Sequence, residues 1–388
     1  MRRNRSASKR APVGLIAWGA YDETKPRVRL LLKELRKTNA LAAEISFPIW
    51  AGIRDKAVAG RRRLIRAGSR LLFAYPKALA QLAKQPGRSA ILLPYPAIPD
   101  IFFAWPVAKI RLHKLIFDAF IPLYDTMVED RALARRDGIM AKGLWALEWA
   151  ALRLADIILV DTDQHGDFYS REFRIARDRF QTVLVGAEPL FWKARSGTKS
   201  KVEEVQTSSR DSVVLFYGQL IPLHGLETIL EAVRLTSDEA IHWLLIGSGQ
   251  EEAKVRDFIA AYPSGKVRWI PWVAYEQLPG IIASSAVALG VFGTSDKAAR
   301  VIPNKMFQVL AAGKAVVTRA SPAVDPIAAR YPEAVITTPA GDGAALADAV
   351  RKALQNPGKL GAVPPETEAE LGPAKGVQAL LERLSTAG

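Results

Sequence analysis

Three junctions between an apolar strand, a glycine loop and a helix constrain the fold of this chain more than any other feature. They occupy residues 213–225, 243–249 and 300–317. A strand that ends in glycine and leads into a helix directs backbone N–H groups and the positive end of the helix dipole towards one point, which suits a phosphate. Three such junctions predict a site for a nucleotide-like ligand.

The order of these segments resembles the C-terminal domain of GT-B glycosyltransferases, in particular the retaining family four. The matching motifs are the loops Gly218–Gly225 and Gly247–Gly249 and the segment that begins Pro303-Asn304-Lys305, while segments 148–162 and 183–191 resemble the end of that family's N-terminal domain. The resemblance implies two doubly wound, Rossmann-like α/β domains facing a central cleft. It also implies transfer of a sugar from a nucleotide-sugar donor to a glycan or glycolipid acceptor, with retention and with no metal or other cofactor.

The alternation of strands and helices independently predicts parallel sheets covered by helices. The expected strands are 13–18, 90–93, 115–118, 157–161, 213–217, 242–246, 267–270, 287–289 and 315–318, and helices are expected at 27–37, 142–155, 344–354 and 377–384. We divide the chain into a basic tail (1–10), an N-terminal acceptor-side domain (11–191), a linker (192–211), a C-terminal nucleotide-sugar-binding domain (212–365) and a C-terminal segment (366–388). By resemblance, the last helix crosses back to the N-terminal domain.

The predicted donor site lies in the second domain. Its residues are Gly218, Gln219, His224, Gly225, Gly247, Gly249, Arg300, Asn304, Lys305 and Gln308. Arg300 and Lys305, near the start of a helix, are expected to neutralise the leaving diphosphate. On spacing alone, a surface helix with solvated basic residues explains segment 300–313 equally well, and glycine after a strand is common in any α/β fold.

The chain departs from the family pattern at four of these positions. The family's Glu-x7-Glu pair falls on Arg300 and Gln308. The resemblance assigns the second carboxylate to the ribose, and Gln308 can still donate and accept hydrogen bonds there. The first carboxylate touches the sugar, where Arg300 reverses the charge. Gln219 and His224 stand where Arg and Lys commonly hold the diphosphate. A non-catalytic GT-B-like protein that binds a membrane or partner is therefore the alternative hypothesis.

Acceptor-side candidates follow two strands of the first domain. Asp118 ends a strand, and Tyr124 and Asp125 come shortly after it. Carboxylates at strand ends face the crevice, so we predict Asp118 and Asp125 as catalytic candidates that orient acceptor hydroxyls. Capping of the next helix is an equally good interpretation. Gly19 and Tyr21 follow the first strand, where the family brings backbone close to the transferred group.

Histidines and cysteines predict no metal site. His224 has no second histidine or carboxylate at ligand spacing, and we interpret His113 and His165 as structural. The chain has no cysteine, which excludes disulfides and a cysteine nucleophile and fits a reducing cytoplasm.

The net charge of +15 is concentrated in two segments. Residues 1–10 hold five basic and no acidic side chains, and residues 53–88 hold ten basic side chains and one acidic one. Leucines at helical spacing accompany Arg61, Arg62, Arg63, Arg66 and Arg70. This pattern is typical of a basic amphipathic helix on an anionic membrane. Solvated arginines beside a stripe that packs on the domain are the alternative. Nucleic-acid binding is disfavoured because stacking aromatic side chains are not interleaved with the charges.

The targeting signals favour a peripheral protein on the cytoplasmic face of the cell membrane. No apolar run approaches the roughly 20 residues of a membrane span. The first 20 residues imitate a secretion signal, but the apolar part is short and contains Pro12, Gly14 and Trp18. We therefore expect a basic tail followed by the first strand.

Overall fold

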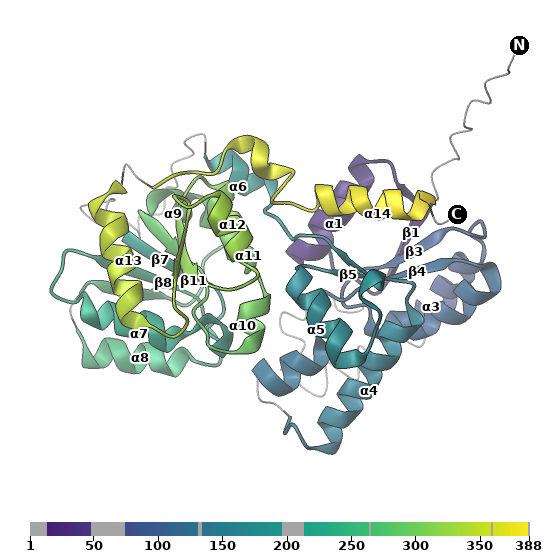
Figure 1. The fold of residues 1–388 in the computed structure, drawn as a ribbon, viewed down its shortest axis with the longest axis horizontal. Coiled ribbons are helices and arrows are strands. Elements are labelled where there is room, and N and C mark those ends of the chain that lie inside the picture. Colours follow the sequence, from purple (N-terminus) through teal and green to yellow (C-terminus); the bar gives the residue numbers. More distant parts are fainter. Residues whose placement is uncertain are drawn as a thin grey trace, which may run out of the picture.

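The structure is a computed structural model that describes residues 14–47, 74–130, 134–195, 213–263, 265–357 and 360–386. The basic tail and the five arginines assigned to the membrane lie outside these ranges. Within them, two parallel six-stranded sheets covered by helices form two lobes (Figure 1). The predicted two-domain, doubly wound α/β architecture is confirmed.

The N-terminal sheet has the strand order β2-β1-β3-β4-β5-β6. Its strands are β1 (Leu15–Gly19), β2 (Leu41–Ser46), β3 (Ala90–Leu93), β4 (Lys114–Asp118), β5 (Ile157–Val160) and β6 (Phe180–Thr182). β3 and β5 read Ala-Ile-Leu-Leu and Ile-Ile-Leu-Val and are buried throughout, as parallel strands covered on both faces must be. The sequence predicted four of these strands and missed β2 and β6.

The C-terminal sheet has the strand order β12-β11-β10-β7-β8-β9, which is that of a Rossmann domain. All strands are parallel, and the strand order reverses between β7 and β10. Its strands are β7 (Val213–Tyr217), β8 (His242–Ile246), β9 (Val267–Ile270), β10 (Val287–Leu289), β11 (Val316–Arg319) and β12 (Val335–Thr338). The bounds of β7 to β10 are those predicted. In such a sheet the ligand crevice lies at the carboxyl ends of the strands beside the reversal.

Helices cover both sheets. The N-terminal domain has α1 (Pro26–Lys37), a helix at 74–83, α3 (Ile98–Arg111), α4 (Ile139–Leu154), α5 (Asp163–Phe173) and the short π-helix η1 (Asp125–Asp130). The second domain has α6 (Pro189–Ala194), α7 (Leu226–Leu235), α8 (Glu252–Ala261), α9 (Leu278–Ser284), α10 (Asp296–Arg300), α11 (Asn304–Ala311), α12 (Asp325–Arg330) and α13 (Gly343–Gln355). None of the described helices combines the length and apolar character needed to cross a membrane.

The chain crosses between the domains twice. α6 packs on the C-terminal domain, where Phe191 is fully buried, so the first crossing precedes residue 189. α14 (Ala374–Thr386) returns to the N-terminal domain and buries Val377 and Leu380 in the core that contains Leu31 of α1. Figure 1 shows α14 lying across α1. The expected return of the last helix is confirmed.

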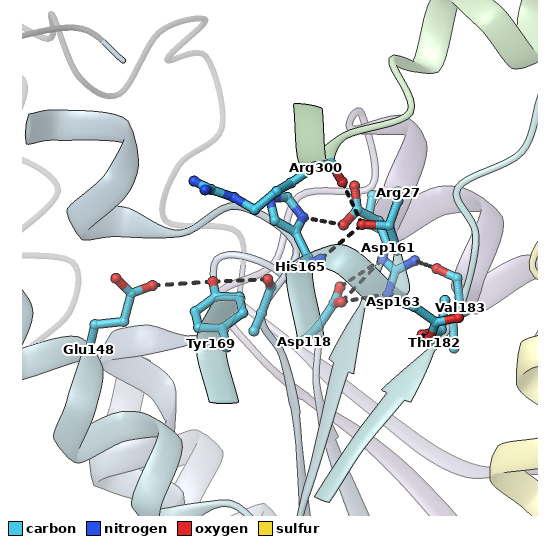
Figure 2. A network of polar contacts seen from close by, with 12 residues as sticks. Arg27, Asp118, Glu148, Asp161, Asp163, His165, Tyr169, Thr182, Val183 and Arg300 are labelled. Atoms are coloured by element: carbon cyan, nitrogen blue, oxygen red, sulfur yellow. Dashed lines mark hydrogen bonds and ion pairs between the residues drawn. The ribbon is translucent and has the colours of Figure 1, made fainter. Parts of the chain in front are cut away.

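A buried ion pair fixes the centre of the N-terminal domain. Arg27 of α1 and Asp118 at the end of β4 are 2.8 Å apart, with side chains 1% and 0% exposed. The guanidinium also donates to the carbonyl of Val183 beyond β6, and the carboxylate accepts from the backbone of Tyr95 (Figure 2). The pair of Asp118 and Arg27 thus holds α1 against the sheet, at β4 and at the residue that follows β6.

We expect Arg27→Met to lower the free energy of unfolding by about 3–5 kcal/mol, because it leaves the Asp118 carboxylate buried without its counter-charge. The double variant Arg27→Met/Asp118→Asn should recover much of this loss, since no buried charge remains. Urea unfolding of the three proteins measures both effects. A loss below about 1 kcal/mol in the single variant would contradict the structural role of the pair.

Candidate active site

Two of the predicted glycine loops lie directly against each other. Gly218 follows β7 and Gly247 follows β8, with φ angles of 144° and 145° that side chains rarely adopt. A Cβ on Gly247 would lie 1.8 Å from the carbonyl oxygen of Gly218, so both loops require glycine to pack this closely. The backbone of Leu220 also bonds to the second loop, donating to Ser248 and accepting from Glu251.

The backbone N–H groups of these two glycines are not free to donate to a phosphate. The N–H of Gly218 bonds to the carbonyl of Ile246 at 2.9 Å, and the N–H of Gly247 bonds to that of Ile270 at 2.9 Å. The loops extend the hydrogen-bonding ladder of the sheet by one residue. The glycines therefore serve close packing, and another group must provide the attraction for an anion.

Lys305 supplies that group. It lies in the first turn of α11, is 7% exposed, and its Nζ lies 4.0 Å from the ring centre of Phe216. A Cβ on Gly218 would be 3.2 Å from this Nζ, which places the ammonium at the first glycine loop. Nζ is buried and has no hydrogen-bond partner among the described residues, and burial lowers the pKa of Lys305 well below its usual value. A buried, unpaired ammonium is strongly stabilised by an anionic ligand.

His224 completes the same cluster as a neutral side chain. Its Cε1 is 3.1 Å from the position of a Cβ on Gly218, and its Nδ1 contacts the carbonyl oxygen of Gln219. Because a carbonyl only accepts, Nδ1 carries the proton, and Nε2 is left as an acceptor. Burial is the main cause that lowers the pKa of His224 well below its usual value, and the nearby charge of Lys305 lowers it further. His224 therefore adds no positive charge to the site.

The remaining predicted donor-site residues frame this cluster. Gly225 begins α7 and lies against the backbone of Phe292, and Gly249 lies against that of Leu220. Asn304 starts α11, and its Oδ1 is buried without a hydrogen-bond partner among the described residues. Gly313 ends α11 at φ 76°, as predicted for the helix stop.

Gln308 faces protein groups on all sides. Its amide oxygen accepts from Tyr217 at 3.0 Å, and its Nε2 donates to Tyr275 at 2.9 Å and to the Glu188 carboxylate at 3.3 Å. Tyr275 and Arg29 of α1 also donate to Glu188, which is 2% exposed. This network joins the C-terminal domain to α1. The ribose contact implied by the family resemblance remains a prediction for Gln308.

Arg300 points across the cleft to the N-terminal domain. Its Nη2 lies 3.0 Å from Oδ1 of Asp125, and its guanidinium lies 4.0 Å over the ring of Phe168. Its backbone carbonyl accepts a hydrogen bond from the Thr162 hydroxyl at 2.6 Å. Lys297 of α10 also crosses, donating to Thr126 at 2.9 Å. Arg300 thus links α10 to η1 and α5. In this arrangement its guanidinium contacts the N-terminal domain and is not part of the Lys305 cluster.

Asp125, the second catalytic candidate, lies in a buried acidic region. It is 1% exposed, and its Oδ2 has no hydrogen-bond partner in the described part of the chain. Glu148 of α4 accepts from the amides of Leu123 and Tyr124 at 2.9 and 2.8 Å and from the Tyr169 hydroxyl (Figure 2). Burial raises the pKa of Glu148 to about 7, and the Asp125 charge adds to the shift. Catalytic roles for Asp118 and Asp125 stay predictions, and both carboxylates have arginine partners.

The first loop of the N-terminal domain is held by Asp100. Gly19 has φ 137°, and a Cβ there would lie 2.2 Å from Oδ2 of Asp100, which accepts from the amide of Ala20 at 2.9 Å. Tyr21 is 1% exposed, and burial raises its pKa to about 12. Tyr124 is only partly buried and packs on the hydrophobic core. Gly19 and Tyr21 thus form a rigid corner at the carboxyl end of β1.

Sequence reasoning missed the partners of these groups. No role was predicted for Glu188, Glu148, Asp100 or Arg27, although Glu148 and Glu188 lie in the two segments of the N-terminal half that resemble the family. His165, interpreted as structural without a partner, contacts the Asp161 carboxylate through Nδ1 (Figure 2). Across the described ranges, no three metal-binding side chains lie together.

Comparisons with known proteins agree with this geometry. The family model "Glycosyl transferases group 1" matches residues 211–356, which span both glycine loops and the Lys305 helix. Residues 211–356 thus match a glycosyltransferase family, and the two-domain architecture of the chain is that of the GT-B fold. No curated protein is similar to this chain in sequence at a significant level.

Solved structures share the fold over nearly the whole length of the chain. Anabaena HepE in complex with UDP is 12% identical with a TM-score of 0.66, and the match covers 97% of this chain and 100% of HepE. Sucrose-phosphate synthase from Thermosynechococcus elongatus is 17% identical with a TM-score of 0.63, over 98% and 94% of the two chains. A glycosyltransferase from Rickettsia africae is 12% identical with a TM-score of 0.62, over 97% and 98%.

The Glu188 network predicts the effect of restoring the family's glutamate at Gln308. We expect Gln308→Glu to destabilise the protein, because a second buried carboxylate would lie about 3 Å from Glu188. The double variant Gln308→Glu/Glu188→Gln, which exchanges the two side-chain types, should be more stable than the single variant. Thermal unfolding measures both. A Gln308→Glu protein as stable as the wild type would contradict the contact.

Proposed function

We propose that this glycosyltransferase binds a nucleoside-diphosphate sugar with its diphosphate at Lys305 and transfers the sugar to a glycan or glycolipid acceptor. The observation that carries the proposal is the buried ammonium of Lys305, which lies at the first glycine loop without a partner. A diphosphate would supply the counter-charge, and its departure in the reaction would be stabilised by the same cation. HepE has been solved with UDP and with UDP-glucose, so a uridine nucleotide is the first donor to test.

The transfer we propose proceeds with retention and needs no metal, since fixed protein cations neutralise the leaving group. Lys305 is in place, and Arg300 becomes available if the cleft opens and its contact with Asp125 breaks. Opening and closing of such clefts commonly accompanies substrate entry and product release. Asp125, which stands opposite on η1, would then face the acceptor.

Donor hydrolysis separates this proposal from the alternative of a GT-B-like protein without turnover. The proposed enzyme releases the nucleoside diphosphate from the correct nucleotide sugar slowly in water and faster with acceptor. A protein that binds UDP in a titration but releases none from a panel of nucleotide sugars, with or without acceptors, would favour the alternative.

Lys305→Met should weaken UDP binding by about 1.5–3 kcal/mol, the range for hydrogen bonds to charged groups. Burial lowers the pKa of Lys305, and a bound diphosphate raises it again, so binding takes up a proton. Affinity should therefore fall as pH rises through the lowered pKa of the free Lys305 side chain, and this dependence should disappear in the variant. Calorimetry in buffers of different ionisation enthalpy measures affinity and proton uptake together.

Lys266→Met is the matched control. Lys266 directly precedes β9, at the amino ends of the strands and away from the glycine loops, and it donates to the carbonyl of Ser237. The variant should leave both quantities unchanged. Equal UDP affinity in the wild-type and Lys305→Met proteins would remove Lys305 from the donor site.

We also propose that the enzyme works at the cytoplasmic face of the membrane, held there by the basic segments 1–10 and 53–88. Sedimentation with anionic vesicles should be strong at low salt, weak with neutral vesicles, and reduced as ionic strength rises, because salt screens these charges. Charge reversal at Arg61, Arg62 and Arg66 should abolish sedimentation and leave UDP binding intact. A wild-type chain that ignores anionic vesicles at low salt would instead point to a soluble acceptor.

A further inference from the structure

We propose that the N-terminal end of α4 is a second membrane contact, which inserts Ile139 and Met140 into an anionic lipid surface beside the cleft. The inference rests on the proposed membrane function. It adds a second contact surface on the protein, outside the basic segments 1–10 and 53–88. Four observations carry it: the exposure of the two side chains, the charges around them, their place relative to the cleft, and the net positive charge of this end of α4.

The first observation is that two neighbouring apolar side chains protrude into solvent. Ile139 is 92% exposed and Met140 53%, at the first two positions of α4. The rest of the helix is anchored by Ala141, Ala151 and Leu152, which are fully buried. A single exposed apolar residue is ordinary, but an isoleucine with almost its whole surface in water, next to an exposed methionine, buries nothing in the described fold.

The second observation is the charge around this tip. Arg135, Arg136 and Lys142 are all exposed and flank the apolar pair in sequence. Asp137 is the only acidic residue between Ala134 and Leu147. Cationic side chains around an apolar pair match the two layers of a membrane interface, since the cations meet anionic headgroups and the apolar groups enter the acyl boundary.

The third observation is the position of the tip. α4 ends at Leu154 and leads into the start of β5 at Ile157. The N-terminal end of α4 therefore lies beside the carboxyl ends of the strands. Thr162 and Asp125, which meet Arg300 across the cleft, follow strands at this same edge. Figure 1 shows the lower end of α4 protruding from the N-terminal domain, below the C-terminal domain's α10. A lipid surface at the tip would therefore lie near the entrance for a lipid-linked acceptor.

The fourth observation selects a lipid surface over a second copy of the chain. Residues 134–147 hold three basic side chains and one acidic one, so two copies that met at this cationic tip would repel each other. An anionic bilayer is attracted by the same charges. Self-association is thus the outcome that the charge disfavours.

The experiment measures the partition coefficient on phosphatidylglycerol-containing vesicles for the full chain and three variants. Ile139→Glu should lower it about tenfold or more, corresponding to the lost burial of one isoleucine side chain. Ile139→Trp should raise it, because tryptophan favours the interface. Ile110→Glu is the matched control: Ile110 is also apolar and 81% exposed, but it lies near the end of α3, at the opposite edge of the sheet, and its loss should change partitioning less than twofold.

All variants should retain the wild-type circular dichroism spectrum and UDP affinity, since the substituted side chains are exposed. If the wild type binds vesicles but Ile139→Glu binds equally well, the tip does not contact lipid and this inference is wrong, while the proposed membrane function stands. A larger loss with Ile110→Glu than with Ile139→Glu would also overturn it. If the wild type does not bind, both fail together.

Discussion

The buried ammonium of Lys305 is the group around which the C-terminal half of the cleft is arranged. Phe216 lies beneath it, the first glycine loop passes beside it, and His224 is kept neutral next to it. None of these neighbours offers a counter-charge. The free energy of burying an unpaired cation is unfavourable, so a ligand that brings negative charge would stabilise this part of the fold. Close packing of the loops at Gly218 and Gly247 leaves the backbone near the cation without side chains in the way.

Two polar networks tie this half of the cleft to the other domain, and each involves a departure from the family motif. Gln308 replaces a glutamate, and the carboxylate of Glu188 stands 3.3 Å away, so one negative charge is still present in the network. Arg300 replaces the other glutamate and meets Asp125 across the cleft. In both places an acidic residue elsewhere in the chain complements the change. The departures thus rearrange charge across the domain interface and keep opposite charges, or a carboxylate and an amide donor, in contact there.

The sequence predicted the parts of the fold that depend on local pattern. The bounds of β7 to β10 and the helix stop at Gly313 follow from apolar runs and glycine, and the convergence of Gly218, His224 and Lys305 follows from the order of motifs along a parallel sheet. It missed α3, because Pro99 and Pro106 argue against a helix that Ile101, Ala104 and Ala108 nevertheless bury against the core. It also missed the partners of Asp118 and Arg300, since ion pairs that span 91 and 175 residues leave no local signal.

The central claim is that Lys305 holds the donor diphosphate, and a crystal structure with UDP tests it most directly. The account predicts a diphosphate oxygen within hydrogen-bonding distance of Nζ of Lys305, about 2.7–2.9 Å, with the nucleoside extending between the carboxyl ends of β7 and β10. UDP bound elsewhere, with Nζ of Lys305 still buried against Phe216 and without an anionic partner, would contradict it.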